Sequence, residues 1–129
     1  MRLLFDTHLL LWAATSPEKL PQKALEMLED YSVTPLYSSA SIWEVAIKAR
    51  LGRDDLQIDP RVWRTGMNEN GYHELCIDSG HALIAGELPL IHKDPFDRML
   101  VAQAKAEGVT LVTADAQVAR YDGPIELIR

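Results

Sequence analysis

Four acidic side chains stand where the chain passes between predicted strands and helices: Asp6, Glu44, Asp97 and Asp115. Asp6 and Asp115 come just after apolar runs, whereas Glu44 and Asp97 lie in the first turns of predicted helices. In an α/β fold with parallel strands, the carboxyl ends of the strands share one edge of the sheet, and ligands bind there. The sequence therefore predicts that the four carboxylates face one cleft.

Carboxylates that share a cleft repel one another, and their pKa values rise unless a cation lies among them. Oxygen ligands favour the hard cations Mg²⁺ and Mn²⁺, which keep bound waters. Such ions polarise a phosphoryl oxygen, lower the pKa of a bound water and stabilise the leaving oxygen. The four acids together therefore indicate a metal centre suited to phosphate chemistry.

Each acid also has a purely structural explanation. Ser41 and Glu44 have the spacing of a capping box with Ser41 as the N-cap. Asp94, Pro95 and Asp97 supply an N-cap, a first-turn proline and an acid at the third helical position. The other two acids can cap the segments that follow them. Taken singly, each acid is more readily explained as a capping residue; taken together, the four favour a metal.

The helix predicted over residues 41–50 is largely apolar and carries one polar stripe, formed by Ser41, Glu44 and Lys48. A buried helix directs such a stripe into a cleft. An exposed ion pair between Glu44 and Lys48, four positions apart, explains the stripe equally well.

Other polar residues near the acids have candidate supporting roles. Thr7, Thr113 and Asp94 are candidates to support the ligands, with Asp94 as the N-cap that positions Asp97. The candidate phosphate contacts are Lys48, Lys93 and Arg98, with Arg50 and Arg53 as further cations near the cleft.

Two histidines, His8 and His92, lie close to the acids in sequence. Neither has a second histidine at a spacing typical of metal sites, so we favour a hydrogen-bonded structural role for both over a ligand role.

Strands and helices alternate along the chain. The predicted strands are 2–5, 35–38, 74–77, 109–113 and 125–128, and the predicted helices are 7–14, 21–30, 41–50, 60–70, 79–88 and 95–107. This order predicts an α/β three-layer sandwich with a mostly parallel central sheet of four to five strands, the last of them at an edge. We expect residues 1–129 to form a single domain.

Composition narrows the class of protein further. The chain has 129 residues, of which 47% are apolar and 25% charged, as is typical of a globular domain. Cys76 is the only cysteine, which excludes an intrachain disulfide and fits a reducing cytosol. Apolar runs are too short to span a membrane, so we expect a cytoplasmic protein with no membrane partner. The net charge of −6 disfavours broad binding to nucleic acid but allows a local basic rim.

Four segments resemble the PIN-domain family, and in particular the VapC-like toxins of bacterial toxin–antitoxin pairs: residues 3–8, 39–45, 92–104 and 111–115. The third segment is the most specific. The resemblance implies a PIN-like fold and a metal-dependent endoribonuclease, in which Mg²⁺ or Mn²⁺ held by Asp6, Glu44, Asp97 and Asp115 activates water against an RNA phosphodiester. His8 departs from the asparagine that many members carry.

The resemblance also implies partners, namely an RNA substrate, a small antitoxin that neutralises the toxin, and a second copy in a homodimer. The predicted first and third helices carry more apolar side chains than one side of a small core needs: Leu9, Leu10, Trp12, Trp43 and Ile47. We predict that some of these form an exposed groove for an antitoxin helix, with the homodimer on a different face.

Two alternatives remain at this stage. A phosphatase with Asp6 as its nucleophile is disfavoured, because the haloacid-dehalogenase pattern needs a second acid where His8 stands. A non-catalytic PIN-fold module that binds protein predicts separated carboxylates and no cation.

Overall fold

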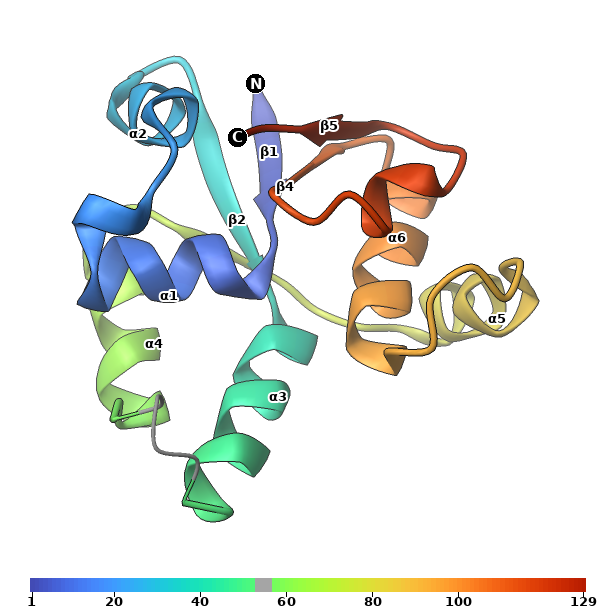
Figure 1. The fold of residues 1–129 in the computed structure, drawn as a ribbon, viewed down its shortest axis with the longest axis horizontal. Helices are drawn as coiled ribbons and strands as arrows, with labels where there is room; N and C mark the ends of the chain where they lie inside the picture. Colours follow the sequence, from blue (N-terminus) through green and yellow to red (C-terminus); the bar gives the residue numbers. More distant parts are fainter. Residues whose placement is uncertain (53–56) are drawn as a thin grey trace.

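The computed structural model describes residues 1–52 and 57–129, so Arg53 lies outside the described residues. Its centre is a five-stranded sheet in which every neighbouring pair is parallel, in the order β3-β2-β1-β4-β5 (Figure 1). The strands are β1 (Arg2–Phe5), β2 (Thr34–Ser38), β3 (His73–Leu75), β4 (Thr110–Thr113) and β5 (Ile125–Leu127). The predicted α/β class and the edge position of the last strand are confirmed.

Helices alternate with the strands, close to the predicted bounds. They are α1 (Thr7–Thr15), α2 (Gln22–Glu29), α3 (Ser39–Arg50), α4 (Pro60–Glu69), α5 (Ser79–Glu87) and α6 (Pro95–Glu107), with short 3₁₀ turns η1 (Pro17–Lys19) and η2 (Val118–Arg120). Among the described residues, no helix combines the length and hydrophobicity that a membrane span requires.

The sheet is buried on both faces, which explains why its strands are apolar runs rather than alternating ones. Successive side chains of β1 point to opposite faces, so Leu3 and Phe5 belong to one core cluster and Leu4 to the other. The first cluster includes buried side chains from α1, α2, α3 and α4, and the second includes side chains from α6 and η2. These layers form the predicted sandwich.

The helix nearest the predicted site, α3, begins earlier than predicted. Its N-cap is Ser38, whose hydroxyl accepts a hydrogen bond from the amide of Ala40 at 3.0 Å. Ser41 instead lies inside the helix, and its hydroxyl is 2.7 Å from that of Thr7 in α1. The predicted capping box of Ser41 and Glu44 is therefore wrong, because the last residue of β2 already caps the helix.

The start of α6 matches the prediction. The carboxylate of Asp94 accepts hydrogen bonds from the amides of Phe96 and Asp97, at 2.9 and 3.4 Å. The helix ends at Gly108, which adopts a φ of 66°, a left-handed conformation that glycine takes without steric cost.

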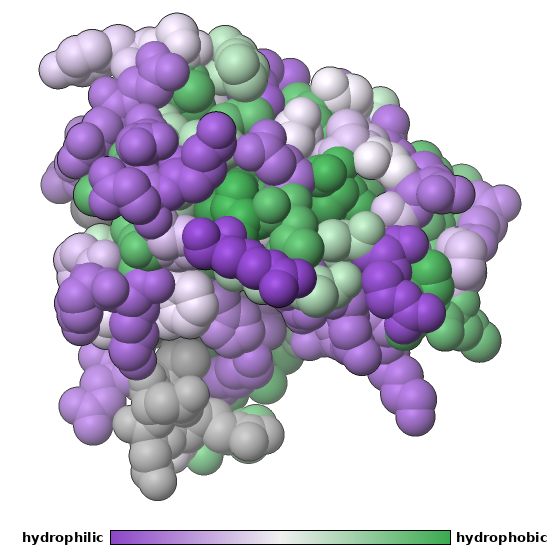
Figure 2. Space-filling model, turned by 45° about the horizontal axis from the view of Figure 1, so that its top comes forward, coloured by the Kyte–Doolittle hydropathy of each residue, from purple (hydrophilic) through white to green (hydrophobic). Residues whose placement is uncertain are grey.

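The surface is not uniformly polar. Figure 2 shows one face on which apolar side chains gather near the middle, bordered by hydrophilic ones. Single apolar side chains at a surface are ordinary in folded proteins.

Candidate metal centre

The parallel topology brings the predicted acids to one edge of the sheet. Asp6 directly follows β1, Asp115 follows β4, and Glu44 lies in the helix that follows β2. Asp97 comes from the first turn of α6. Chain segments that are far apart in sequence thus supply carboxylates to the same region of the fold.

Asp6 is buried and tightly held. Its Oδ1 accepts a hydrogen bond from the amide of Leu9 at 3.0 Å, and its Oδ2 accepts from the hydroxyl of Thr113 at 2.5 Å and the amide of Ala114 at 3.3 Å. Burial raises the pKa of Asp6, and these hydrogen bonds oppose the rise. These hydrogen bonds fix the orientation of the Asp6 carboxylate at the end of β1.

Asp97 carries the clearest electrostatic sign of convergence. Its pKa is raised from 3.8 to about 7, mainly by burial and then by the negative charges of Asp94, Glu44 and Asp6, while His92 acts in the opposite direction. Charges at a distance from one another would not have this effect. The neighbouring acids therefore act on Asp97, and Lys48 and His92 offset their negative charge in part.

A histidine joins two of these acids. The Nε2 atom of His92 lies 3.0 Å from Oδ2 of Asp97 and 3.7 Å from Oδ2 of Asp115. One donor atom from each residue falls within 4.8 Å of the other two. Among the described residues, Asp6 and Glu44 do not join a metal-sized group of three, although their charges raise the pKa of Asp97.

Sequence reasoning favoured a hydrogen-bonded structural role for His92. The Nδ1 atom of its ring accepts a hydrogen bond from the amide of Asp94 at 3.5 Å, and its Nε2 atom faces Asp97. His92 is therefore hydrogen-bonded, as predicted. In the sequence, His92 stands two residues before Asp94 and five before Asp97, and no common metal motif has that spacing. Little in the sequence therefore indicates that the His92 ring lies against Asp97.

Glu44 is almost completely buried, and Lys48 holds one of its oxygens. The Nζ atom of Lys48 donates to Oε2 at 2.7 Å, whereas Oε1 has no hydrogen-bond partner among residues 1–52 and 57–129. Both interpretations of the polar stripe are therefore partly right: the ion pair forms, and Ser41 and Glu44 are buried while Lys48 is partly exposed. Ser41 continues the stripe by bonding to Thr7.

A cleft of about 380 Å³ opens beside Glu44, between α1 and α3. Its polar lining includes His8, Lys19 and Lys48, and its apolar lining includes Trp12. Of the four predicted acids, the lining of this cleft includes Glu44, and two lysines, Lys19 and Lys48, place positive charge there.

Arg98 does not take the predicted role of a phosphate contact. Its guanidinium donates hydrogen bonds to the Tyr121 hydroxyl at 3.2 Å and to three carbonyl oxygens at 2.8 to 3.1 Å, those of Ala85, Leu88 and Pro89. These bonds join the end of α5 to α6. Lys93 is exposed, and Lys48 is partly exposed with its Nζ atom paired to Glu44.

The predicted apolar groove is only partly present. Leu9 and Leu10 are buried in the core and cannot line an exposed groove, because α1 packs on the sheet through them. Trp43 is 63% exposed and Ile47 36% exposed, and the Trp43 ring packs edge-on against Phe96. Trp63 is buried in the core.

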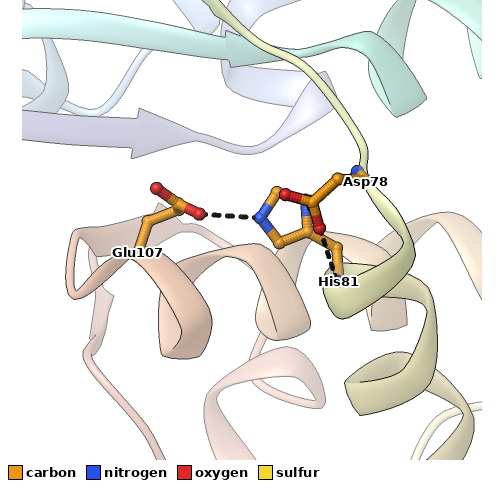
Figure 3. Close-up of side chains that lie close together, drawn as sticks. All are labelled: Asp78, His81 and Glu107. Carbon is orange, nitrogen blue, oxygen red and sulfur yellow. Dashed lines mark hydrogen bonds and ion pairs between the residues drawn. The ribbon is translucent and has the colours of Figure 1, made fainter.

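A second cluster of candidate ligands, Asp78, His81 and Glu107, has a structural role (Figure 3). The Nδ1 atom of His81 accepts a hydrogen bond from the amide of Asp78 at 3.1 Å, so the ring proton is assigned to Nε2, which is 2.9 Å from Oε2 of Glu107. Both ring nitrogens are used. His81 completes a capping box on α5 and fastens that helix to α6.

The structure is thus an α/β protein whose parallel sheet is covered on both faces, with acidic groups at the carboxyl edge that could bind a metal. The family model for the PIN domain matches residues 3–124, and the chain belongs to the PIN domain family.

Solved structures agree with this assignment. VapBC2 from Rickettsia felis, bound to a DNA fragment from its promoter, matches with a TM-score of 0.75 and 17% identity, over 100% of both chains. DNA-bound VapBC from Salmonella typhimurium matches with a TM-score of 0.69 and 18% identity, over 98% of this chain and 97% of that one. VapBC-5 from Mycobacterium tuberculosis, a member of a family of toxin–antitoxin systems, matches with a TM-score of 0.66 and 14% identity. The match covers 99% of this chain and 98% of that one. At these identities the likeness shows the fold. A comparison with curated proteins finds no match.

Proposed function

We propose that this protein is a metal-dependent endoribonuclease that acts as the toxin of a toxin–antitoxin pair. The observation that carries the proposal is the raised pKa of Asp97, caused by burial and by the charges of neighbouring acids. Carboxylates held close together repel one another, and a divalent cation among them relieves this repulsion.

The donor set fits a divalent cation. One buried carboxylate oxygen, Oε1 of Glu44, has no hydrogen-bond partner among the described residues, although unsatisfied buried polar atoms are costly. We assign Asp6, Glu44, Asp97 and Asp115 to the centre. A bound Mg²⁺ or Mn²⁺ there supplies an acidified water and charge stabilisation at a phosphodiester.

The chain's own residues orient these acids. Thr113 and the amide of Leu9 fix the carboxylate of Asp6, and Asp94 fixes the first turn of α6, which carries Asp97. Lys48 positions Glu44 and, with Lys93 at the rim, offers positive charge to the RNA backbone. These contacts hold the ligands in place before substrate binds.

The partner assignment rests on the fold likeness and on exposed apolar side chains. Solved relatives include VapBC complexes, and Trp43 and Ile47 leave an apolar strip on α3 beside the acids. We propose that an antitoxin helix covers this strip and that a basic side chain of the antitoxin reaches the carboxylates. We place the homodimer contact on a different face, so that inhibition and dimerisation do not compete.

One observation favours a non-catalytic binding module instead. Lys48 and His92 already sit against two of the acids, which partly neutralises the cluster without a metal. The deciding experiment incubates purified protein with a structured RNA, with Mn²⁺ or with EDTA, beside Asp97→Asn. Cleavage that needs both the metal and Asp97 supports the nuclease; no cleavage and no metal binding supports the module.

A further inference from the structure

We propose that the cleft between α1 and α3 binds one nucleotide of a single-stranded RNA, with the base on Trp12 and the phosphate at Lys19. The inference rests on the proposed function, because it takes RNA as the substrate, and it adds a site for a base beside the metal centre.

The first argument is the place and the size of the cleft. Its volume of about 380 Å³ is typical of sites for small ligands. Glu44, one of the acids assigned to the centre, lines it, and Oε1 of Glu44 has no hydrogen-bond partner among the residues that the structure describes. A nucleotide in the cleft is therefore the neighbour of a proposed metal ligand.

The second argument is the aromatic wall. His8 and Trp12 stand about one turn apart on α1, and both line the cleft. Their ring centroids are 6.1 Å apart and their planes are inclined by 52°, so the two rings do not stack on each other. Trp12 is partly buried and packs against the core, which holds the ring in place. A base of any type can stack on a ring held in this way, and single-stranded RNA exposes its bases for such contacts.

The third argument is charge. The charged lining of the cleft consists of two cations, Lys19 and Lys48, and one acid, Glu44. Lys48 pairs with Glu44, whereas Lys19 is exposed and makes no ion pair within the described part of the chain. An exposed cation attracts the phosphate of a nucleotide and repels a basic side chain. The lining therefore favours a nucleotide over a basic side chain of the antitoxin.

Nuclear magnetic resonance of the three tryptophan indole N–H groups tests the site without any activity measurement. The probes are the four nucleoside 5′-monophosphates, which have no internucleotide bond to cleave, and the three signals are assigned by single Trp→Phe variants. We expect a saturable shift of the Trp12 signal with nucleotide and none with inorganic phosphate. Trp43 and Trp63 do not line the cleft, so their signals should stay in place as internal controls.

Variants give a second readout, with binding followed by the ³¹P signal of the nucleotide. Trp12→Leu should weaken nucleotide binding about tenfold, whereas Trp12→Phe, which keeps an aromatic ring, should weaken it much less. Lys19→Gln should weaken binding about threefold. Lys23→Gln is its matched control, because Lys23 is equally exposed and lies outside the lining. Since Lys19 is exposed, its variant tests the site even if Trp12→Leu does not fold.

A Trp12 signal that does not move at millimolar nucleotide would overturn the inference, as would an equal shift with inorganic phosphate or an equal shift of the Trp43 signal. A shift with arginine amide but not with nucleotide would also overturn it and would make the cleft a site for the antitoxin.

RNA cleavage by the same protein keeps the two proposals apart. Metal-dependent cleavage without a Trp12 shift leaves the nuclease standing and removes the nucleotide site. A saturable Trp12 shift without cleavage leaves the nucleotide site standing and removes the nuclease.

Discussion

The hydroxyl of Thr113 donates a hydrogen bond to Oδ2 of Asp6, joining residues 107 positions apart at the carboxyl ends of the adjacent strands β1 and β4. Thr113 also accepts a hydrogen bond from the amide of Asp115 at 3.0 Å. The Thr113 side chain therefore orients both Asp6 and Asp115, so a substitution at Thr113 tests how the acids are held in position.

Replacing Thr113 by valine should remove the donor to Asp6 while keeping the side-chain shape. We expect a loss of about 1 to 3 kcal/mol in the free energy of unfolding, because a buried carboxylate loses a hydrogen bond, and a further rise in the pKa of Asp6. Chemical denaturation measures the first. Thr110→Val, at the other end of β4, is the control; an equal loss there would contradict a specific role for Thr113.

Asp97→Asn should lower the rate of RNA cleavage by orders of magnitude without unfolding the protein. The asparagine keeps the shape of the side chain but removes the charge that a cation requires. In the absence of metal and above pH 7 the variant should be at least as stable as the wild type, since it relieves repulsion from Asp94 and Glu44. Thermal melts and cleavage assays on one preparation decide the matter; retained cleavage would reduce Asp97 to a structural residue.

The stability of the metal-free protein should depend on pH in a defined direction. Because the pKa of Asp97 is raised from 3.8 to about 7, the folded state holds a proton that the unfolded chain has already released between those values. The contribution of this group to the free energy of unfolding therefore falls as pH rises from about 4 to about 7 and is constant above. Comparing wild type with Asp97→Asn across this range isolates it; identical pH profiles would contradict the raised pKa.

Mn²⁺ should raise the melting temperature of the wild-type protein in a concentration-dependent way, because a ligand that binds only the folded state stabilises it. The effect should be strongest above pH 7, where the metal no longer competes with a proton on Asp97. Asp97→Asn should show little of this shift. A shift of equal size in the variant would place the metal elsewhere.

Arg98→Ala and Lys93→Ala should separate structure from RNA contact. Arg98 bonds three carbonyl oxygens and a hydroxyl, so its loss should cost about 2 to 4 kcal/mol of stability. Lys93 is exposed, so its loss should leave stability within about 0.5 kcal/mol and weaken RNA binding. Denaturation curves and filter binding to RNA measure the two effects, and the reverse pattern would restore Arg98 as a phosphate contact.

Most helices and strands of this fold can be predicted from local sequence signals such as capping residues, prolines and glycines. Asp94, Pro95 and Gly108 mark both ends of α6 through capping and backbone preference, and the helix begins and ends as predicted. The start of α3 was missed because several serines precede it, and only the path of β2 determines that Ser38 is the cap.

The site was harder to foresee where long-range packing decides it. The edge position of the acids follows from parallel strands, but nothing local tells that His92 points between Asp97 and Asp115 or that Arg98 turns away toward the end of α5. Both depend on the loop before α6, which Tyr121 holds from a distant part of the chain. Likewise, the burial of Leu9 and Leu10 depends on how α1 lies on the sheet.

The strand order has a consequence for how this protein comes into being on the ribosome. β1 pairs with both β2 and β4, and Asp115 follows β4. Asp6 and Asp115 can therefore come together only after almost the whole chain has been synthesised. A nascent chain that ends before residue 110 has neither Thr113 to orient Asp6 nor Asp115 to complete the cluster. The proposed nuclease is thus inert during its own translation, and incomplete products released early carry no working centre.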